Sequence, residues 1–581
     1  RFLLFSLPLN LLNKRDVMFY KKLPSLNLLV ISISFAFIHN SAVANNVIVD
    51  AGKSANTTVS KNGDGSETIS INKANDMNLS VNYFEQFNVG KEGVNIDNSE
   101  AKAKVILNEV TSKKTSSLEG KISVLGQDAE LIIANPNGID CYGCQFSGSD
   151  KVMLISGKLD SITGKKIHLS DGYVNLKNVN NFNEKQTINV FSNRINILGK
   201  NKIPVFNVIN GYETVSFVDY DWKGDQGKEL SKDNQEGFSI LENSLLKTDL
   251  FSLQGGIFNL DGDLITKKIN IIRNKEINAN EKSVFGIINK KNEFRAYNEV
   301  DLMFMLASMK LYFLEIDAKK SAEIALELEA LEEKIMELEP HNIHKNRLKK
   351  IRELAAEARR VADQQQAEYN KIQSAVLKID EAKQAEKRKL EAEGKEIGSA
   401  LQYIESDNIN FKGKLAIINS EVLFNARNIN VDIDKTISYV RNSGVSFNAH
   451  QDNNYSGRFA LINSSIRFLG YRNIPIGDGN DDNSLDKNKL NDINLNKLSM
   501  LGFGQIFAHG DNINITDVKF KETLSDDGLS KTYIDLIADN EINIKGQFKT
   551  SLINKYSLFK FASKITENDK VIFDINPHKT K

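Results

Sequence analysis

The sequence predicts a mainly β protein, built as a solenoid and interrupted by one long helical segment. Short apolar stretches alternate with Gly, Asn and Asp, which is typical of short strands joined by turns. The string Asn-Ile-Asn occurs at residue 408 and again at residue 428, a spacing of about one solenoid coil. In such a coil Ile faces a continuous core, and Asn lies at bends or stacks on the Asn of the next coil. An abrupt change to Ala, Glu, Lys, Leu and Gln predicts the helix.

Strand-like patterning covers residues 45–300 and resumes over residues 399–581. Examples of its apolar stretches are Val105-Ile106-Leu107, 129–134, 152–155 and Ile195-Asn196-Ile197, and later echoes of the repeat begin at Asn512 and Ile542. The chain has 75 basic and 75 acidic residues, so its net charge is zero. No overall basic field exists to attract nucleic acid.

Residues 301–398 form the predicted helical insertion. Apolar residues step by four and three on each side of Pro340, which cannot continue a helix. We expect an antiparallel coiled-coil hairpin, with pairing to another chain as the alternative. The predicted seam contains Ile324, Leu328, Leu331, Ile335, Leu338, Ile351, Ala355, Ala358, Ala362, Gln365, Tyr369, Ile372, Val376 and Ile379.

Residues 1–44 are expected to be a signal and leader region. A start at Met18 gives two lysines, an apolar run over 28–38, and Ala42-Val43-Ala44 as a small-x-small cleavage site. The mature chain would begin at Asn45. The apolar run is short for a membrane span, and a buried hydrophobic helix is the alternative. Residues 1–17 are either an extended leader or a misassigned start.

The sequence contains two cysteines, Cys141 and Cys144. A small disulfide across a tight turn, formed after export to an oxidising compartment, is the preferred interpretation. A redox pair or half of a zinc site is the alternative, but the second half of a zinc site is missing and no histidine lies nearby in sequence.

No catalytic, cofactor or metal site is predicted. His341 and His344 lie in a charged stretch where solvated histidines are usual. The Asp/Asn-rich stretch 477–491 lacks the ligand spacing of a calcium loop. Asp219, Asp221 and Trp222 form the one acid-aromatic cluster to examine for a β-helix glycan-active enzyme, although scattered acids are normally surface residues.

Several ordered motifs resemble the secretion domain of two-partner secretion exoproteins, the filamentous haemagglutinin and haemolysin family. The resemblance spans roughly residues 45–280 and begins with the start motif Asn82, Phe84, Phe87, Asn88 and Val89. The further motifs are Ile106-Leu107-Asn108-Glu109-Val110, Leu118-Glu119-Gly120-Lys121-Ile122, Asn135-Pro136-Asn137-Gly138-Ile139 and Cys141-Tyr142-Gly143-Cys144-Gln145-Phe146.

The resemblance implies a right-handed parallel β-helix and a secretion motif at Asn135, Pro136, Asn137, Gly138 and Ile139. These residue types also predict a tight turn, because Pro136 fixes its own backbone and Gly138 is permissive. The implied partner is a cognate outer-membrane β-barrel transporter with periplasmic peptide-binding domains. The family's Asn-Pro-Asn-Leu motif is absent, which places the chain nearer the haemolysin-like branch and leaves that motif's role without a counterpart here.

We therefore expect a secreted or cell-surface protein of a Gram-negative bacterium, without enzyme activity or cofactor, that acts as a haemagglutinin-like adhesin in virulence. A haemolysin or contact-dependent toxin is the alternative, for which the apolar stretch 302–314 would enter a target membrane rather than pack as a buried helix. A β-helix glycan-active enzyme is the weaker alternative.

Overall fold

The chain divides into two compact units, Arg1–Ala44 and Asn45–Lys581. The computed structural model describes residues 47–160, 164–180, 185–218, 221–227, 237–289, 318, 321–336, 345–392, 401–471, 490–522, 533–550 and 564–568, all of them in the second unit. The expected signal region, Pro340, His341, His344, Asp219, the stretch 302–314 and most of the loop 477–491 lie outside these ranges.

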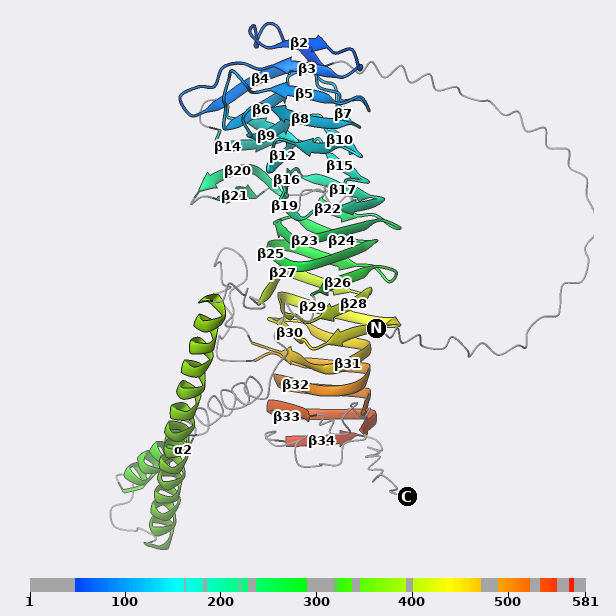
Figure 1. Cartoon of the computed structure of the whole chain (residues 1–581). Coiled ribbons are helices and arrows are strands. Elements are labelled where there is room, and N and C mark those ends of the chain that lie inside the picture. Colours follow the sequence, from blue (N-terminus) through cyan, green and yellow to red (C-terminus); the bar gives the residue numbers. More distant parts are fainter. Residues whose placement is uncertain are drawn as a thin grey trace, which may run out of the picture. The chain divides into compact units, whose positions relative to one another are not determined.

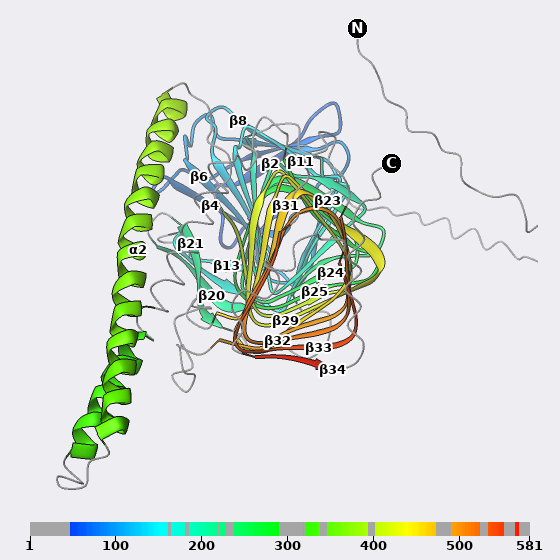
Figure 2. The same ribbon diagram turned by 90° about the horizontal axis from the view of Figure 1, so that it is seen from below.

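Parallel strands stacked coil upon coil make up most of the described chain (Figure 1). Twenty-five described strands belong to one continuous sheet, in which the pairing of β1 with β4 is antiparallel and the pairings between coils are parallel. Figure 2 shows these strands curving around an interior. The prediction of a mainly β, β-helix-like protein is confirmed. The strands are β1 (Ile48–Val49), β4 (Leu79–Gln86), β6 (Val105–Val110), β7 (Ser116–Leu118), β9 (Glu130–Ala134), β10 (Ile139–Tyr142), β12 (Lys151–Ile155), β15 (Val174–Lys177), β16 (Thr187–Phe191), β17 (Arg194–Leu198), β18 (Lys200–Lys202), β19 (Val205–Ile209), β22 (Gly237–Ile240), β23 (Leu245–Gln254), β24 (Ile257–Leu260), β25 (Asp263–Ala279), β26 (Val284–Ile288), β27 (Gln402–Phe411), β28 (Lys414–Ile418), β29 (Glu421–Arg441), β30 (Gly444–Ala449), β31 (Asn453–Leu469), β32 (Ile493–Glu522), β33 (Tyr533–Thr550) and β34 (Lys564–Asn568).

Two smaller sheets accompany the first coils. A five-stranded sheet begins with an antiparallel pair and continues in parallel from coil to coil. A four-stranded antiparallel sheet packs its apolar side chains with residues that point outward from the coils, including Leu107, Met153 and Phe191. The strands are β2 (Thr58–Lys61), β3 (Glu67–Ser70), β5 (Val94–Asp97), β8 (Lys121–Leu125) and β11 (Gln145–Ser147), then β13 (Gly157–Leu159), β14 (Lys166–Leu169), β20 (Tyr212–Val218) and β21 (Asp221–Gly227).

Aromatic rings stack along the interior of the coils. Phe424 pairs with Phe447 at 5.0 Å between ring centroids, and Phe447 with Phe468 at 6.0 Å. All three rings are fully buried or nearly so. Since the backbone register places Phe424 opposite Phe447, and Phe447 opposite Phe468, each coil extends the core of the previous one without a separate hydrophobic centre.

The Asn-Ile-Asn repeat lies in direct register. Asn408 pairs with Asn428 and Ile409 with Ile429, so the 20-residue spacing is one coil at this point. Both isoleucines are fully buried, and the Asn428 amide donates to Asn408 Oδ1 at 2.8 Å. The repeat asparagines therefore stack within strands. The expected stacking on the Asn of the next coil is confirmed, whereas the expected location at bends is wrong, because the left-handed corners are formed by other asparagines, such as Asn442 with φ 47°.

Helix occupies residues 321–336 and α2 (Lys345–Ala392). Their side chains meet in antiparallel order: Ser321 donates to Gln365 at 2.9 Å, Arg359 pairs with Glu329 at 2.5 Å, and Arg352 pairs with Glu332. Within the described ranges, neither helix combines the length and apolar character needed to cross a membrane.

The predicted seam holds only in part in its first arm: Leu328 and Ile335 are half-buried, but two other predicted residues face solvent. Ile324 and Leu331 are 51% and 46% exposed, whereas Ala325 is buried. The face directed at α2 carries Ser321, Ala325 and Glu329, because the small residues permit close approach and the acidic ones pair with arginines of α2. The spacing of apolar residues alone does not show whether the face with Ile324 or the face with Ala325 packs on α2.

The helical insertion leaves the β stack in register. Asn278 of β25 pairs with Asn410 of β27, and Ile287 of β26 pairs with Ile417 of β28. Across the same interface Gln402 Oε1 accepts a hydrogen bond from the Ile269 amide at 2.6 Å. Coils on either side of residues 290–400 are therefore direct neighbours.

Phe424→Ala is expected to lower the free energy of unfolding by about 3–5 kcal/mol, because it opens a cavity within the ring stack. Denaturant unfolding followed by far-UV circular dichroism measures the effect. Leu501→Ala, at a position 43% exposed, is the matched control and should change stability by less than about 0.5 kcal/mol. Equal effects of the two variants would contradict the stacked core.

Candidate functional site

The Asn135–Ile139 turn connects β9 to β10 and is closed by the Gly138 amide, which donates to the Asn135 carbonyl at 3.2 Å. The Asn135 side chain is fully buried. Its Nδ2 donates to the Lys114 carbonyl and to Ser116 Oγ, both at 3.0 Å, and its Oδ1 accepts from the Asn137 amide at 2.9 Å. Asn135 therefore fastens the turn to the preceding coil.

Asn137 is half-buried and holds the same turn from outside. Its Nδ2 donates to the Ser112 carbonyl at 2.8 Å and to Asn135 Oδ1 at 2.9 Å. Of the two motif asparagines, Asn137 is thus the one with side-chain surface accessible to another molecule.

The following coil covers the other side of the turn. The Pro136 carbonyl accepts from Ser170 Oγ at 2.6 Å, and Ile139 is fully buried in the core. Gly138 has φ 137°, and a Cβ there would lie 2.8 Å from the Tyr173 ring. Glycine is therefore required both by the backbone and by the packing of Tyr173.

The start motif is likewise mostly internal. Asn82 is fully buried, and its Oδ1 accepts from Thr57 Oγ1 and from the Asn72 amide, each at 2.9 Å. Phe84 and Phe87 lie in the core with ring centroids 5.1 Å apart. These contacts join β4 to the N-terminal segment.

Strand β7 connects the two motifs. The Ser117 amide donates to Asn88 Oδ1 at 2.9 Å, and Val89 bridges Leu118. On the other side Ser116 donates its amide to the Gly138 carbonyl at 3.0 Å and accepts from Asn135. Sequence reasoning missed Ser116 and Ser117. The signal for them is their position just before the recognised Leu118-Glu119-Gly120 string.

Cys141 and Cys144 form a disulfide in the structure, with their Cα atoms 5.3 Å apart. Both side chains are buried, and Gly143 between them has φ 78°. The bridge closes a short local loop directly after β10, next to the Asn135–Ile139 turn.

A half-exposed polar group lies beside the disulfide. Asp140 accepts from Tyr173 Oη at 3.1 Å and from Asn175 Nδ2 at 2.8 Å, and Lys177 Nζ lies 5.6 Å from the Tyr142 ring centroid. Burial, with the negative charge of Asp140, raises the pKa of Tyr173 and Tyr142. Both tyrosines therefore stay neutral hydrogen-bonding groups at physiological pH.

Glu109, from the second recognised motif, is 7% exposed on β6. Burial raises the pKa of its carboxyl group, and the nearby charge of Lys158 opposes that rise. Its neighbour Asn108 is fully buried, and neither polar atom of its side chain has a hydrogen-bond partner among the described residues. This part of the secretion-like region therefore carries polar groups that burial disfavours.

Of the acid-aromatic cluster predicted from the sequence, the structure describes Asp221 and Trp222, and the Trp222 ring serves in packing. Trp222 packs edge-on to Phe191 and against Phe217, with centroids 5.7 and 5.3 Å away, and Asp221 accepts from the Trp222 amide. Within the described ranges, no group of three or more His, Cys, Asp or Glu side chains is arranged to hold a metal ion.

Comparison with known proteins gives a match for the first half of the chain. Residues 46–280 match the family model of the TPS secretion domain. The chain is 27% identical over 295 residues to a hemolysin of Proteus mirabilis, a match covering 45% of this chain and 18% of that protein. It is 34% identical over 126 residues to a 16S rRNA endonuclease CdiA of Enterobacter cloacae, covering 18% and 4%. These matches span less than a fifth of either relative.

Two solved structures are also similar. The secretion domain of filamentous hemagglutinin has 19% sequence identity and a TM-score of 0.34, with 41% of this chain and 96% of that chain covered. The HMW1 secretion domain from Haemophilus influenzae has 10% identity and a TM-score of 0.29, with 88% and 97% covered.

Asn135→Ala is expected to lower the free energy of unfolding by about 1–3 kcal/mol, because it leaves buried polar partners unsatisfied. Asn137→Ala, which removes bonds at a half-buried position, should cost less. Denaturant unfolding of the parent and both variants measures which variant loses more free energy of unfolding. A larger loss for Asn137→Ala would contradict the assignment of Asn135 as the main anchor.

Glu109→Gln is expected to become more stable relative to the parent as the pH rises. Because the folded-state pKa of Glu109 is raised, the folded chain retains this proton to higher pH than the unfolded chain, whose ordinary value is 4.5. The contribution of Glu109 to the parent's free energy of unfolding is fully present below pH 4.5 and is lost as the pH rises through the folded-state pKa. Thermal unfolding of both proteins across this range is the measurement. Parallel pH profiles would contradict the prediction.

Proposed function

Residues 46–280 are a two-partner secretion N-terminal domain, and from this premise we propose that the chain is exported through a cognate outer-membrane β-barrel transporter and acts outside as an adhesin. Residues 1–44 would direct it to the periplasm, and the transporter's periplasmic peptide-binding domains would recognise the secretion domain. The family match is the observation that carries the export route. The matching family is a secretion domain, not an enzyme family.

The covalent structure supports transport of an unfolded chain. The sequence has two cysteines, and their bridge joins residues three positions apart. No disulfide therefore connects distant coils and obstructs threading. Outside the cell, each coil would add its strands and rings to the coil already folded, so that folding proceeds by nearest-neighbour contacts and opposes return.

Recognition by the transporter would use the accessible side of the Asn135–Ile139 turn. Asn135 is fully buried and Asn137 is half-buried. We assign Asn135 and the start motif to maintaining the fold, and Asn137, Pro136 and the group around Tyr142 to the surface that a partner meets. In an unfolded chain both asparagines would be accessible.

The domain boundaries proposed for the chain are a leader over 1–44, the secretion domain within 45–300, a coiled-coil hairpin over 301–398 and a further β-helix region over 399–581. The antiparallel contacts of residues 321–336 with α2 support the hairpin. Continuous pairing of β25 with β27 supports its placement as an insertion between neighbouring coils. In an adhesin it would serve as a spacer or binding element.

A haemolysin or toxin role is the second candidate function. It is favoured by similarity to proteins named hemolysin and toxin, each of which is matched over a small part of its length. Lysis of red blood cells by the purified chain would favour this role over the adhesin.

Release into the medium is expected to require co-expression of the cognate transporter. Asn135→Ala and Asn137→Ala should each lower release several-fold, the first through loss of the turn and the second through loss of accessible contacts. Quantitative immunoblots of medium and periplasm measure both. Asn430→Ala, outside residues 46–280, is the matched control and should be released like the parent.

Two outcomes would contradict the export route. One is release of the parent without a transporter, and the other is retention of the parent in the periplasm despite a cognate transporter. Normal release of Asn137→Ala would contradict a contact role for that side chain.

A further inference from the structure

A one-way ladder of amide hydrogen bonds runs along the outer face of the coils. At the same position of successive coils, each Asn Nδ2 donates to Oδ1 of the Asn in the coil before it, and all these bonds have the same direction. Such bonds reinforce one another because each polarises the next. The distances are 3.2 Å for Asn278 to Asn259, 3.0 Å for Asn410 to Asn278, 3.4 Å for Asn430 to Asn410, 2.9 Å for Asn454 to Asn430, 2.9 Å for Asn494 to Asn454, 2.9 Å for Asn514 to Asn494 and 3.0 Å for Asn543 to Asn514.

The same ladder continues in the earlier coils, where Asn196 donates to Asn175 at 2.9 Å and Asn175 to Asp140 at 2.8 Å. Between the two parts it is broken at one coil. The backbone register places Ser239 opposite Asn196 on one side and opposite Asn259 on the other. Serine is too short to bridge neighbouring coils, and no described residue forms a hydrogen bond with its hydroxyl group.

The break leaves two matched polar ends. Asn259 Nδ2 lacks the acceptor that the ladder supplies elsewhere, and Asn196 Oδ1 lacks the donor. Ser239 is 8% exposed and lines the groove that lies at the break. In each of the coils from Asn259 to Asn543, an Asn carboxamide occupies this position. The break is therefore a position that lacks one carboxamide group, between the Asn259 donor and the Asn196 acceptor.

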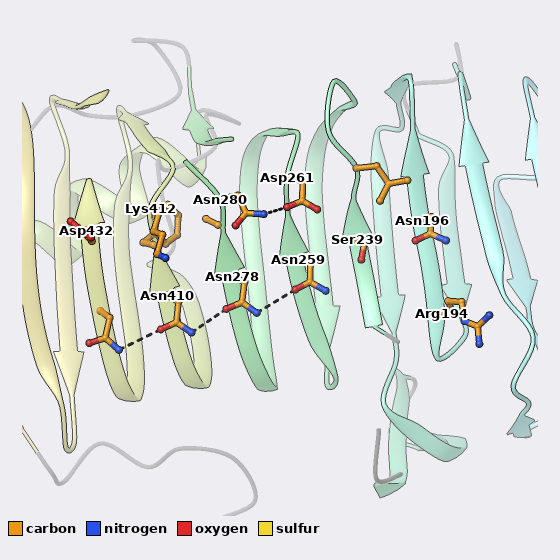
Figure 3. A pocket seen from close by; sticks show the side chains of 14 residues that line it. Arg194, Asn196, Ser239, Asn259, Asp261, Asn278, Asn280, Asn410, Lys412 and Asp432 are labelled. Carbon is orange, nitrogen blue, oxygen red and sulfur yellow. Dashed lines mark hydrogen bonds between the residues drawn. The ribbon is translucent and has the colours of Figure 1, made fainter. Parts of the chain in front are cut away.

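The break opens into a groove of about 670 Å³ that crosses several coils. Figure 3 shows Asn196 and Arg194 on one side of Ser239, and the bonded amides of Asn259, Asn278 and Asn410 on the other. Its second row of lining side chains includes Asp261, Asn280, Lys412 and Asp432. Arg194 Nε is buried without a hydrogen-bond partner among the described residues. Most of the lining residues are polar and supply separate donors and acceptors, while Leu241, Ala279 and Phe411 add apolar surface.

This chemistry disfavours an extended peptide as the occupant. Peptides add to a sheet through the free backbone groups of an edge strand. The groove instead crosses the face of strands that already pair on both sides: β24 pairs with β22 and β25, and β27 with β25 and β29. A ligand must bind through its own polar substituents to side chains.

We propose that the groove binds an N-acetylated glycan, with one acetamido group in the break at Ser239. The acetamido carbonyl would accept from Asn259 Nδ2, and its N–H would donate to Asn196 Oδ1. Sugar hydroxyl groups would meet the ladder amides and the charged side chains of the second row. The inference rests on the proposed adhesin function and gives it a ligand class.

The first experiment measures binding of two probes to the full secreted chain by isothermal titration calorimetry. The β-1,4-linked tetramer of N-acetylglucosamine should bind at least about tenfold more tightly than the β-1,4-linked glucose tetramer, the ratio that corresponds to one ordinary hydrogen bond. Equal affinities, or no binding of the acetylated tetramer, would overturn the proposal.

The second experiment places an Asn side chain in the break of the ladder. Ser239→Asn should complete the ladder, raise the unfolding midpoint and abolish binding of the acetylated tetramer, so that loss of binding cannot be attributed to unfolding. Asn454→Ser is the matched control, because it opens the same kind of gap outside the groove. It should lower the midpoint and leave binding unchanged. Parent-like binding by Ser239→Asn would overturn the proposal.

Failure of this inference can be distinguished from failure of the proposed function. If the parent attaches to cells but Ser239→Asn still binds the acetylated tetramer like the parent, the acetamido site is wrong and the adhesin proposal stands. If the parent binds the acetylated tetramer but attaches to no cell, the site stands and the adhesin proposal fails.

Discussion

Parallel register between successive coils is the constraint on which the rest of this structure depends. Because each residue lies directly above its equivalent in the coil before, like side chains meet like: Ile409 and Ile429 inside, Asn408 and Asn428 outside. An apolar column becomes a continuous core, and an amide column becomes a hydrogen-bonded ladder. The same geometry makes a single short residue, Ser239, into a local vacancy, because no second layer compensates for it.

Nearest-neighbour stacking also explains how the chain accommodates a long helical insertion. Stability of the β region depends on contacts between adjacent coils, and those contacts continue from Asn278 to Asn410 and from Ile287 to Ile417. The inserted residues form their own antiparallel helical contacts, such as Arg359 with Glu329. Insertion between two coils therefore leaves their pairing intact.

The two motifs proposed to act in secretion follow the same principle. Asn135 and Asn88 act on consecutive residues of β7, so that the two motifs are joined across neighbouring coils. Most of their side chains are internal, including Asn82, Phe84 and Ile139. In the proposed export route, a partner that meets the folded domain would contact Asn137 and the tyrosine-bearing surface beside the disulfide. This short segment must therefore both maintain the shape of the turn and keep one side of it exposed.

The sequence by itself determined the β periodicity, the helical insertion and the tight turn at Asn135–Ile139, because these depend on local composition and on residues with restricted backbones, such as Pro136 and Gly138. Tertiary structure decided which face each residue occupies. Ala325 is buried and Ile324 is exposed, and the repeat asparagines lie within strands. Ser116, Ser170 and Tyr173 contact the turn from other parts of the chain. The groove at Ser239 was also decided there, since its lining comes from residues 194–432. Only the register between coils determines which of these distant residues become neighbours.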